Sequence, residues 1–338
     1  MSDQIKKLAP LIWSEIQKAS KILMHCHRNP DGDSVGGVLA SKFALESLGK
    51  SVTVIWGDSP PPTTLSSVPG YASILRKNWF EINPTDFDLF LAQDSSSLGQ
   101  ISNLGEVKFP ENLTVIVIDH HVTNDNYGKI NLVGPSYPAV CQILYDLFSL
   151  WDIKLTPDIA LCLFTGIYTD TGGFKYPLVT KETFQIAAKL AETGADFPKL
   201  IFEMENSQDP KSIEYMGMFF SSVEHYFGGN VAVCSITRQQ LLEKQIDLDI
   251  DVPELANAIK SAVGNEIGIS LTEKDQDVIR VSMRTRGNKY DLSKIAVATG
   301  AGGGHPVAAG ATIKKPMAEA KKFLLETIQK VYPDLGRP

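Results

Sequence analysis

The N-terminal half of the chain alternates short apolar segments with helical patterns, and this alternation restricts the fold more than any other feature. Apolar residues dominate positions 21–26, 51–56, 87–94 and 113–121, which we expect to be buried strands. Strands separated by helices pair in parallel, because each helix returns the chain to the same end of the sheet. We therefore predict an α/β fold with a doubly wound, mainly parallel sheet.

In the second half of the chain, the expected secondary structure is first all helical and then mixed. Residues 136–207 show helical patterns, and strands are expected again at 230–236, 266–274 and 277–285. We assign residues 1–188 to a first domain, residues 189–210 to a helical linker and residues 211–338 to a smaller α/β domain. A chain of 338 residues is long enough for each domain to bury its own core.

Charge and cysteine usage exclude some partners. The formal net charge of -7 leaves no broad basic surface for long duplex nucleic acid, although a few local cations could hold a small phosphorylated substrate. The first twenty residues lack the apolar core of a signal peptide, and no stretch is apolar enough to cross a bilayer. The cysteines are far apart and form no C-x-x-C pair. We expect a cytoplasmic protein with reduced thiols and no membrane partner.

The segment HRNPDGDSVGG, residues 27–37, allows two interpretations. Asp31 and Asp33 could cap the following helix, because Asn, Pro, Asp and Gly favour turns. Alternatively, His27 and the two carboxylates could bind a divalent cation, and ligands usually bind at the carboxyl ends of strands in such sheets. The glycines that end the segment predict a close approach of the helix to the sheet. His25 lies within the expected strand and is expected to bind nothing.

More acidic and histidine residues stand at the ends of other expected elements. They are Asp94, the triplet Asp119, His120 and His121, and Asp170. Each alone could be a helix cap or a structural residue. Together they would meet at one edge of the sheet, where two divalent ions with a bridging carboxylate would use the whole set.

Five motifs in this order resemble the DHH phosphoesterase superfamily. They are H-x-N-P-D-G-D at 27–33, an aspartate after a strand at 94, D-H-H at 119–121, D-T-G at 170–172, and GAGGGHPVAAG at 300–310. The last motif is similar to the signature of the DHH-associated C-terminal domain. The likeness covers nearly the whole chain, and it is greatest to the oligoribonuclease (nanoRNase), pAp phosphatase and cyclic di-AMP phosphodiesterase group.

The resemblance implies a site for two divalent ions. The ligands that it implies are His27 and Asp31 for one ion, Asp33, His120 and Asp170 for the other, and Asp94 as the bridge. An oxygen-rich set with two histidines suits manganese. Asp119 would orient a histidine, and His121 would contact the phosphoryl group or protonate the leaving oxygen.

The resemblance also implies substrate-binding residues in the C-terminal domain. The backbone N–H groups of a loop at Gly302, Gly303 and Gly304 could approach an anion, and the adjacent His305 could donate to phosphate or stack on a base. Arg284 stands at the family's position before this loop and could clamp a phosphate. Arg280 is expected to be a solvated strand residue, without a role in binding.

The kind of second domain narrows the substrate. Within the superfamily, inorganic pyrophosphatases carry a different second domain, RecJ-type exonucleases usually add another domain, and alanyl-tRNA synthetases lack the two-metal site. We therefore expect hydrolysis of short oligoribonucleotides or dinucleotides such as pApA and pGpG to mononucleotides, and of pAp to AMP.

Other substrates and roles stay open. A cyclic di-AMP phosphodiesterase, a RecJ-type single-strand DNA exonuclease and a non-catalytic nucleotide sensor are the alternatives. Ser97 and Gln100 stand where relatives often carry an acidic residue and an arginine, so the preferred substrate is not determined. The sequence does not determine the oligomeric state either, and a homodimer is a candidate.

Overall fold

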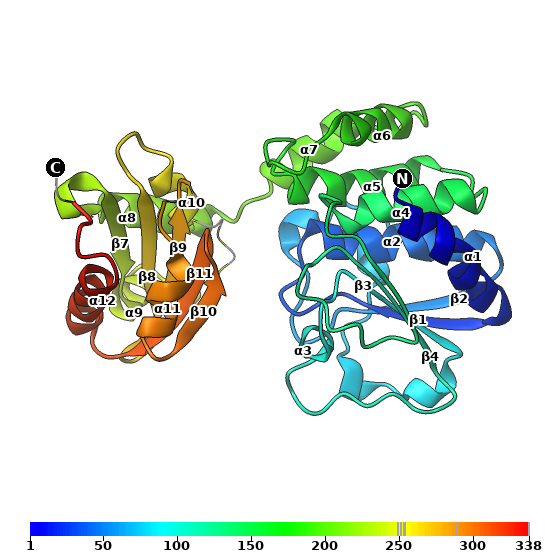
Figure 1. Cartoon of the computed structure of the whole chain (residues 1–338), viewed down its shortest axis with the longest axis horizontal. Coiled ribbons are helices and arrows are strands. Elements are labelled where there is room, and N and C mark those ends of the chain that lie inside the picture. The colour runs from blue at the N-terminus through cyan, green and yellow to red at the C-terminus, as the bar shows by residue number, and fades with distance from the viewer. Residues whose placement is uncertain (249, 251, 253–254, 288, 337–338) are drawn as a thin grey trace. The chain divides into compact units, whose positions relative to one another are not determined.

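The chain has two compact units, each with its own sheet and core. The structure is a computed structural model that describes residues 1–248, 250, 252, 255–287 and 289–336. The units are Met1–Ser207 and Gln208–Pro338 (Figure 1).

The first unit contains a parallel sheet with the strand order β2-β1-β3-β4-β5 within the described residues. Its strands are β1 (Lys21–His25), β2 (Ser51–Ile55), β3 (Leu89–Gln93), β4 (Thr114–Asp119) and β5 (Ile130–Val133). The predicted α/β class with a parallel sheet is confirmed. Strand β5 was not predicted, because its four residues are too short a run to show a period. The order reverses between β1 and β3, which makes the carboxyl ends of these strands the switch point of the sheet.

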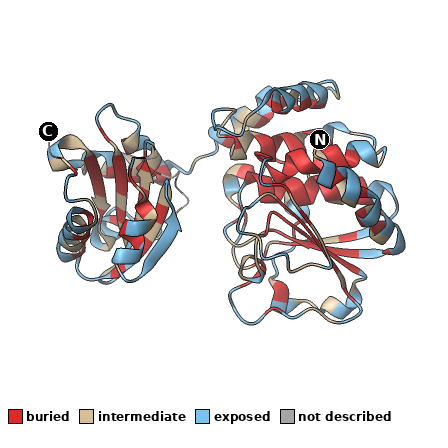
Figure 2. Ribbon diagram, viewed as in Figure 1, coloured by how far each residue is buried: buried red, intermediate tan, exposed pale blue. Residues whose placement is uncertain are grey.

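The longer helices pack on one face of this sheet, and the short helix α3 (Leu98–Ile101) places Ile101 in the core on the other face. The helices of the unit are α1 (Asp3–Lys18), α2 (Gly32–Ser47), α3 (Leu98–Ile101), α4 (Val140–Leu150), α5 (Pro157–Asp170), α6 (Lys181–Ala191) and α7 (Phe197–Glu205). Helices α1, α2, α4 and α5 share the main core with the sheet, and Figure 2 shows their inner surfaces buried. The other face packs against Trp79 and neighbouring residues of an irregular segment between β2 and β3.

The glycines of α2 allow two close approaches. A Cβ on Gly37 would lie 3.0 Å from Oε1 of Gln93, so this glycine faces the sheet as predicted. A Cβ on Gly36 would lie 2.3 Å from the carbonyl oxygen of Cys162, in helix α5. Gly36 therefore permits a contact between two helices, whereas the sequence predicted a contact with the sheet.

The second unit contains a mixed sheet with the order β10-β11-β9-β8-β7-β6, in which only the described pair β7 and β8 is parallel. Its strands are β6 (Glu224–Tyr226), β7 (Val231–Ile236), β8 (Ile267–Asp275), β9 (Val278–Thr285), β10 (Gly302–His305) and β11 (Ala308–Lys314). Its helices are α8 (Pro210–Ser221), α9 (Arg238–Glu243), α10 (Leu255–Lys260), α11 (Leu292–Ala298) and α12 (Met317–Val331). Helices α11 and α12 pack on one face, and α8, α9 and α10 pack on the other.

The glycine-rich segment Gly302–His305 is a strand, whereas the sequence predicted a loop. It pairs with β11 residue by residue, from Gly302 opposite Ala311 to His305 opposite Ala308. Glycine and alanine have low strand propensity, so neither β10 nor β11 could be recognised locally. The pairing with β9 through β11 overrides that propensity.

The boundary between the two units lies between Ser207 and Gln208. Helix α7, which the sequence assigned to a linker, places Phe197 and Leu200 in the core of the first unit. The domain limits 1–188, 189–210 and 211–338 stay predictions.

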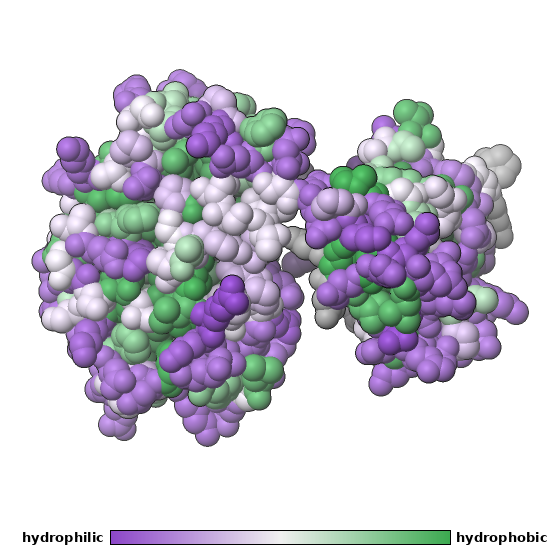
Figure 3. All heavy atoms as spheres, turned by 180° about the vertical axis from the view of Figure 1, so that it is seen from behind, coloured by the Kyte–Doolittle hydropathy of each residue, from purple (hydrophilic) through white to green (hydrophobic). Residues whose placement is uncertain are grey.

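The surface of both units is of mixed character. Figure 3 shows polar and apolar residues interspersed over the face that it presents, as on most folded domains. Among the described residues, no helix is both long enough and apolar enough to cross a membrane.

Candidate metal centre

Three neighbouring strands deliver candidate ligands to one edge of the parallel sheet. His27 follows β1, Asp94 follows β3, and Asp119 ends β4 with His120 directly after it. Because β1, β3 and β4 are adjacent and parallel, their carboxyl ends lie side by side. The order of the sheet therefore brings together residues that are almost a hundred positions apart.

The first group of candidate ligands contains His27, Asp31 and Asp94. Nε2 of His27 lies 3.2 Å from Oδ2 of Asp94 and 3.6 Å from Oδ1 of Asp31. Asp31 is also the N-cap of α2, because its Oδ1 accepts the N–H groups of Asp33 and Ser34 at 3.0 Å. The two interpretations of this segment are therefore compatible, since one carboxylate caps the helix and faces the histidine.

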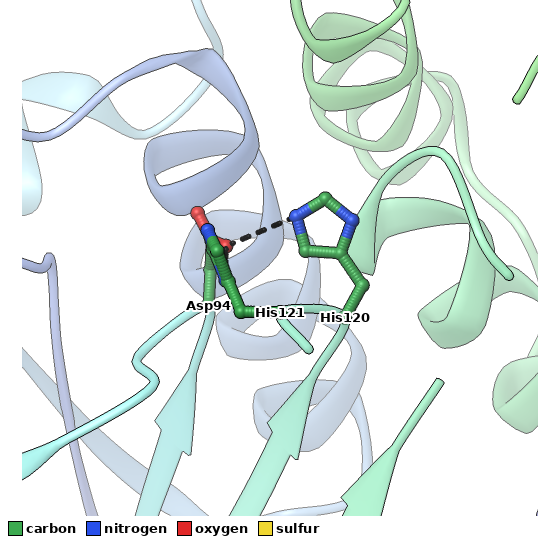
Figure 4. A group of neighbouring side chains, drawn as sticks. All are labelled: Asp94, His120 and His121. Carbon is green, nitrogen blue, oxygen red and sulfur yellow. Dashed lines mark ion pairs between the residues drawn. The ribbon is translucent and has the colours of Figure 1, made fainter. Parts of the chain in front are cut away.

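The second group contains Asp33, His120 and Asp170. Nε2 of His120 lies 3.4 Å from Oδ2 of Asp170 and 3.6 Å from Oδ1 of Asp94, the contact drawn in Figure 4. Nδ1 of His120 faces the carbonyl oxygen of Tyr137 at 3.1 Å, which leaves Nε2 directed at the carboxylates.

Asp33 is held by the N-terminus of α4. The N–H of Val140 donates to its Oδ2 at 2.6 Å, and the N–H of Cys141 donates to its Oδ1 at 2.9 Å. Helix N-termini favour negative charge, so this contact orients the carboxylate. Burial and the nearby charge of Asp94 nevertheless raise the pKa of Asp33 to about 7.

Asp94 belongs to both groups. Its Oδ2 faces His27 and its Oδ1 faces His120. Oδ1 is buried, and no donor among the described residues forms a hydrogen bond with it. A buried polar atom without a partner is costly, and a divalent cation would remove that cost. The position and chemistry of Asp94 therefore fit a carboxylate that bridges two metal ions.

The charge of the site also fits metal ions. Burial, together with the charges of Asp33, Asp31 and Asp94, raises the pKa of Asp170 to about 11. So many carboxyl groups at one place keep protons unless a cation balances them. The residues therefore suit divalent ions, which would displace those protons on binding.

His121 is placed differently from the other histidines. Its Nδ1 lies 2.8 Å from Oδ1 of Asp119, and its side chain is 46% exposed. The hydrogen bond with Asp119 raises the pKa of His121 above its usual value, which favours the protonated ring. Nδ1 is also 3.6 Å from Oδ1 of Asp94, which allows a role as a ligand (Figure 4).

Three supporting residues were not predicted from the sequence. Nδ2 of Asn124 donates to Oδ2 of Asp119 at 2.6 Å and so helps to hold the partner of His121. A Cβ on Gly166 would lie 2.4 Å from Oδ1 of Asp33, so only glycine leaves room for that carboxylate. Oγ of Ser95 lies 3.2 Å from Nε2 of His25, directly beside Asp94. Asn124 closely follows the D-H-H motif, but only the fold shows its contact.

The C-terminal residues that the sequence proposed belong to the second unit. Ala308 of β11 pairs with Arg284 on one side and with His305 on the other, so these three residues form one row on one face of the sheet. A Cβ on Gly302 or Gly304 would lie 2.6 Å from a backbone oxygen of β11, whereas a Cβ on Gly303 would meet no described atom within 4 Å.

Known protein families match each of the two units. The chain matches the DHH family, N-terminal domain, over residues 21–167, and the DHHA1 domain over residues 210–333. The bifunctional oligoribonuclease and PAP phosphatase NrnA of Thermus thermophilus is 29% identical over 97% of each chain. The protein of the same name from Bacillus subtilis is 25% identical over 92% of this chain and 95% of its own. The crystal structure of an exopolyphosphatase-related protein from Bacteroides fragilis has a TM-score of 0.88 at 25% identity, over 98% of both chains.

Proposed function

The chain belongs to the DHH phosphoesterase family and carries a DHHA1 domain, and we propose that it hydrolyses short oligoribonucleotides to mononucleotides and pAp to AMP. The relatives from T. thermophilus and B. subtilis are named for these two activities. One observation carries the proposal, namely that carboxylates and imidazoles from three strand ends and two helices meet around Asp94.

We propose the following roles at this edge of the sheet. His27 and Asp31 would hold one divalent ion, Asp33, His120 and Asp170 would hold the other, and Asp94 would be shared by both. Such ions would supply a water of lowered pKa and would balance the charge that grows on phosphorus. The mixed nitrogen and oxygen donors favour manganese. His121, oriented by Asp119, donates a proton to the leaving ester oxygen.

We propose that the second unit binds the substrate. Arg284 offers a guanidinium fork to a phosphate, and His305 in the same row offers an imidazole to a phosphate or a base. The exposed backbone of Gly302, Gly303 and Gly304 allows close approach of an anion. These groups would bind the phosphates and bases of a short substrate and do not require a double helix.

We further propose that the protein acts in the cytoplasm as a homodimer. All four cysteines are buried and free among the described residues, which suits a reducing compartment. Sedimentation of the purified protein tests the dimer.

The test of the proposed function is a comparison of substrates. Purified protein is incubated with pApA, pGpG, pAp, cyclic di-AMP and long single-stranded DNA, each with Mn²⁺, with Mg²⁺ or with excess chelator, and the products are separated by chromatography. We expect mononucleotides from the dinucleotides and AMP from pAp, fastest with Mn²⁺ and absent with chelator. Full turnover in chelator would contradict the two-metal site, and processive cleavage of DNA without cleavage of dinucleotides would identify an exonuclease instead.

A further inference from the structure

One face of the second sheet is covered by helices over only part of its width. Tyr215 of α8 bonds Thr272 of β8 at 2.9 Å, and a Cβ on Gly268 would lie 2.4 Å from a carbonyl oxygen of α10. The core on this face contains residues of β7 and the helices, and none of its described members comes from β9, β10 or β11. Helix α10 also approaches β9 near Arg284, where Nζ of Lys260 donates to the carbonyl oxygen of Thr285 at 3.5 Å. Within the described chain, this face is therefore open over β10 and β11 and over β9 from Arg280 to Ser282.

The residues on and beside the open part form three parallel rows across the strands. The rows are Arg284, Ala308 and His305, then Ser282, Gly310 and Gly303, then Arg280 and Thr312. The middle row has almost no side-chain bulk. A Cβ on Gly303 would meet nothing within 4 Å, and a Cβ on Gly310 would meet only a backbone oxygen at 3.2 Å. Nη1 of Arg284 donates to Oγ of Ser282 at 3.2 Å, so the guanidinium of Arg284 lies over the β9 end of this row. The flat floor is formed by Gly310 and Gly303, between Arg280 on one side and Arg284 on the other.

At the Arg280 and Thr312 end of this floor lies a hollow of about 400 Å³. Its walls include Lys274, Arg280, Gly310 and Thr312, and no acidic residue lines it within the described chain. That volume lies within the range of small-molecule sites. The hollow therefore favours an anion of modest size.

Arg280 is exposed, at the end of the floor away from Arg284. It lies four residues before Arg284 on the same strand, which places the two Cα atoms roughly 13 Å apart. Guanidinium groups bind phosphate through paired hydrogen bonds. Because the guanidinium of Arg284 extends toward Ser282, and Arg280 can extend toward the same row, the two groups can bind two phosphates that lie closer together than these Cα atoms, with a flat group on the glycines beside them.

We propose that Arg280 and Thr312 bind a second phosphate of an oligonucleotide substrate, one nucleotide away from the phosphate at Arg284. The intervening nucleoside lies on the floor that Gly303 and Gly310 leave open. This inference rests on the proposed function and extends it, because it makes the second unit sensitive to substrate length. The sequence had predicted a solvated residue at position 280, without a binding role.

The experiment compares 5′-phosphorylated RNA of two and of three nucleotides. The kcat and KM values are measured for the unmodified protein, for Arg280→Ala, for Arg280→Lys and for Lys330→Ala. Lys330 is the matched control, since it is an exposed cation on α12, which covers the opposite face. We expect Arg280→Ala to raise the ratio of the trinucleotide KM to the dinucleotide KM roughly tenfold, the size of a lost charge-assisted contact. The kcat values should change little, because the contact acts equally in the ground and transition states.

The other variants sharpen the test. Arg280→Lys should recover part of the effect, and Thr312→Val should raise the same ratio by a smaller factor. Equal changes for both lengths would indicate a general charge effect, and no change would show that position 280 is solvated; either result overturns the inference. Absence of dinucleotide hydrolysis by the unmodified protein would instead contradict the proposed function. Circular dichroism and melting temperature confirm that each variant is folded.

Discussion

Asp94 has a φ of 52°, in the left-handed region, at the end of β3. Aspartate and asparagine enter this region more readily than other side chains, so Asp94→Asn keeps the backbone and removes the charge. We expect this variant to lose bound metal and to hydrolyse dinucleotides at least roughly 100-fold more slowly, since even residues behind metal ligands cost 10–100-fold. Metal content by elemental analysis and turnover are measured together.

The control for that variant is Asp125→Asn, which changes an exposed aspartate in the loop after the D-H-H triplet. It should leave both metal content and turnover close to those of the unmodified protein. Normal metal content in Asp94→Asn would exclude Asp94 as the shared ligand.

His121 tests the division between metal binding and proton transfer. We expect His121→Gln to keep its metal while kcat falls roughly 10²–10⁴-fold, the contribution of a general acid. Because a general acid must carry its proton and the hydrogen bond with Asp119 raises the pKa of His121, kcat of the unmodified protein should fall with rising pH, at a higher pH than an unperturbed histidine would give. The variant should lack that fall, and an equal loss of metal would make His121 a ligand.

His25 should make the free energy of unfolding depend on pH. Its ring is buried between Phe90 and Ser95, and burial lowers the pKa of His25 to about 3. In the unfolded chain this imidazole binds a proton below pH 6.5, whereas in the folded chain it stays neutral until about pH 3. The free energy of unfolding therefore decreases as the pH falls from 6.5 towards 3. The loss from this residue at pH 5 is about 2 kcal/mol.

The variant His25→Gln should remove that dependence. Urea unfolding at pH 7 and pH 5, with chelator present throughout, measures the difference between the variant and the unmodified protein. Identical losses of stability in both proteins would mean that His25 is protonated in the folded state.

At the scale of elements, the close packing of helix α5 on helix α2 fixes the position of the Asp33 carboxylate. A Cβ on Gly166 of α5 would come 2.4 Å from both Oδ1 of Asp33 and Sγ of Cys141. Gly166→Ala should therefore destabilise the protein by about 1–3 kcal/mol through overpacking and should weaken metal binding at Asp33. Denaturant unfolding and metal titration measure the two effects.

Helix α8 provides the matched control. A Cβ on Gly217 would meet nothing within 4 Å, so Gly217→Ala should be neutral or should stabilise by about 0.5–1 kcal/mol through helix propensity. If Gly166→Ala behaved in the same way, the close contact between α5 and Asp33 would not exist.

For the whole molecule, net charge predicts a preference for short substrates. A chain with a formal charge of -7 and few cations near its candidate sites gains little from the extra phosphates of a long strand. We expect pApA and pGpG to be cut faster than long single-stranded RNA at equal molar concentration. The affinity for long RNA should be weak at low salt too, measured by fluorescence anisotropy. Tight binding with a steep salt dependence would contradict this prediction.

The amino-acid sequence by itself determined the fold class and the kinds of ligand. Strands β1, β3 and β4 are continuous apolar runs, and a buried parallel strand produces this pattern locally. The candidate ligands stand directly at the ends of those runs, so both the strands and the residues after them can be read from neighbouring positions. That Asp31 also caps α2 follows from the same local chemistry.

Only the tertiary structure decided which residues support the ligands and which strands join them. Asp33 is held by backbone groups of α4 more than a hundred residues away, and Gly166 is required by the packing of α5 on α2. Strands β10 and β11 exist because they pair with β9, against the propensity of their glycines and alanines. The physical reason is that hydrophobic periodicity reports the burial of each element, whereas pairing and packing depend on contacts between distant segments, which no local pattern contains.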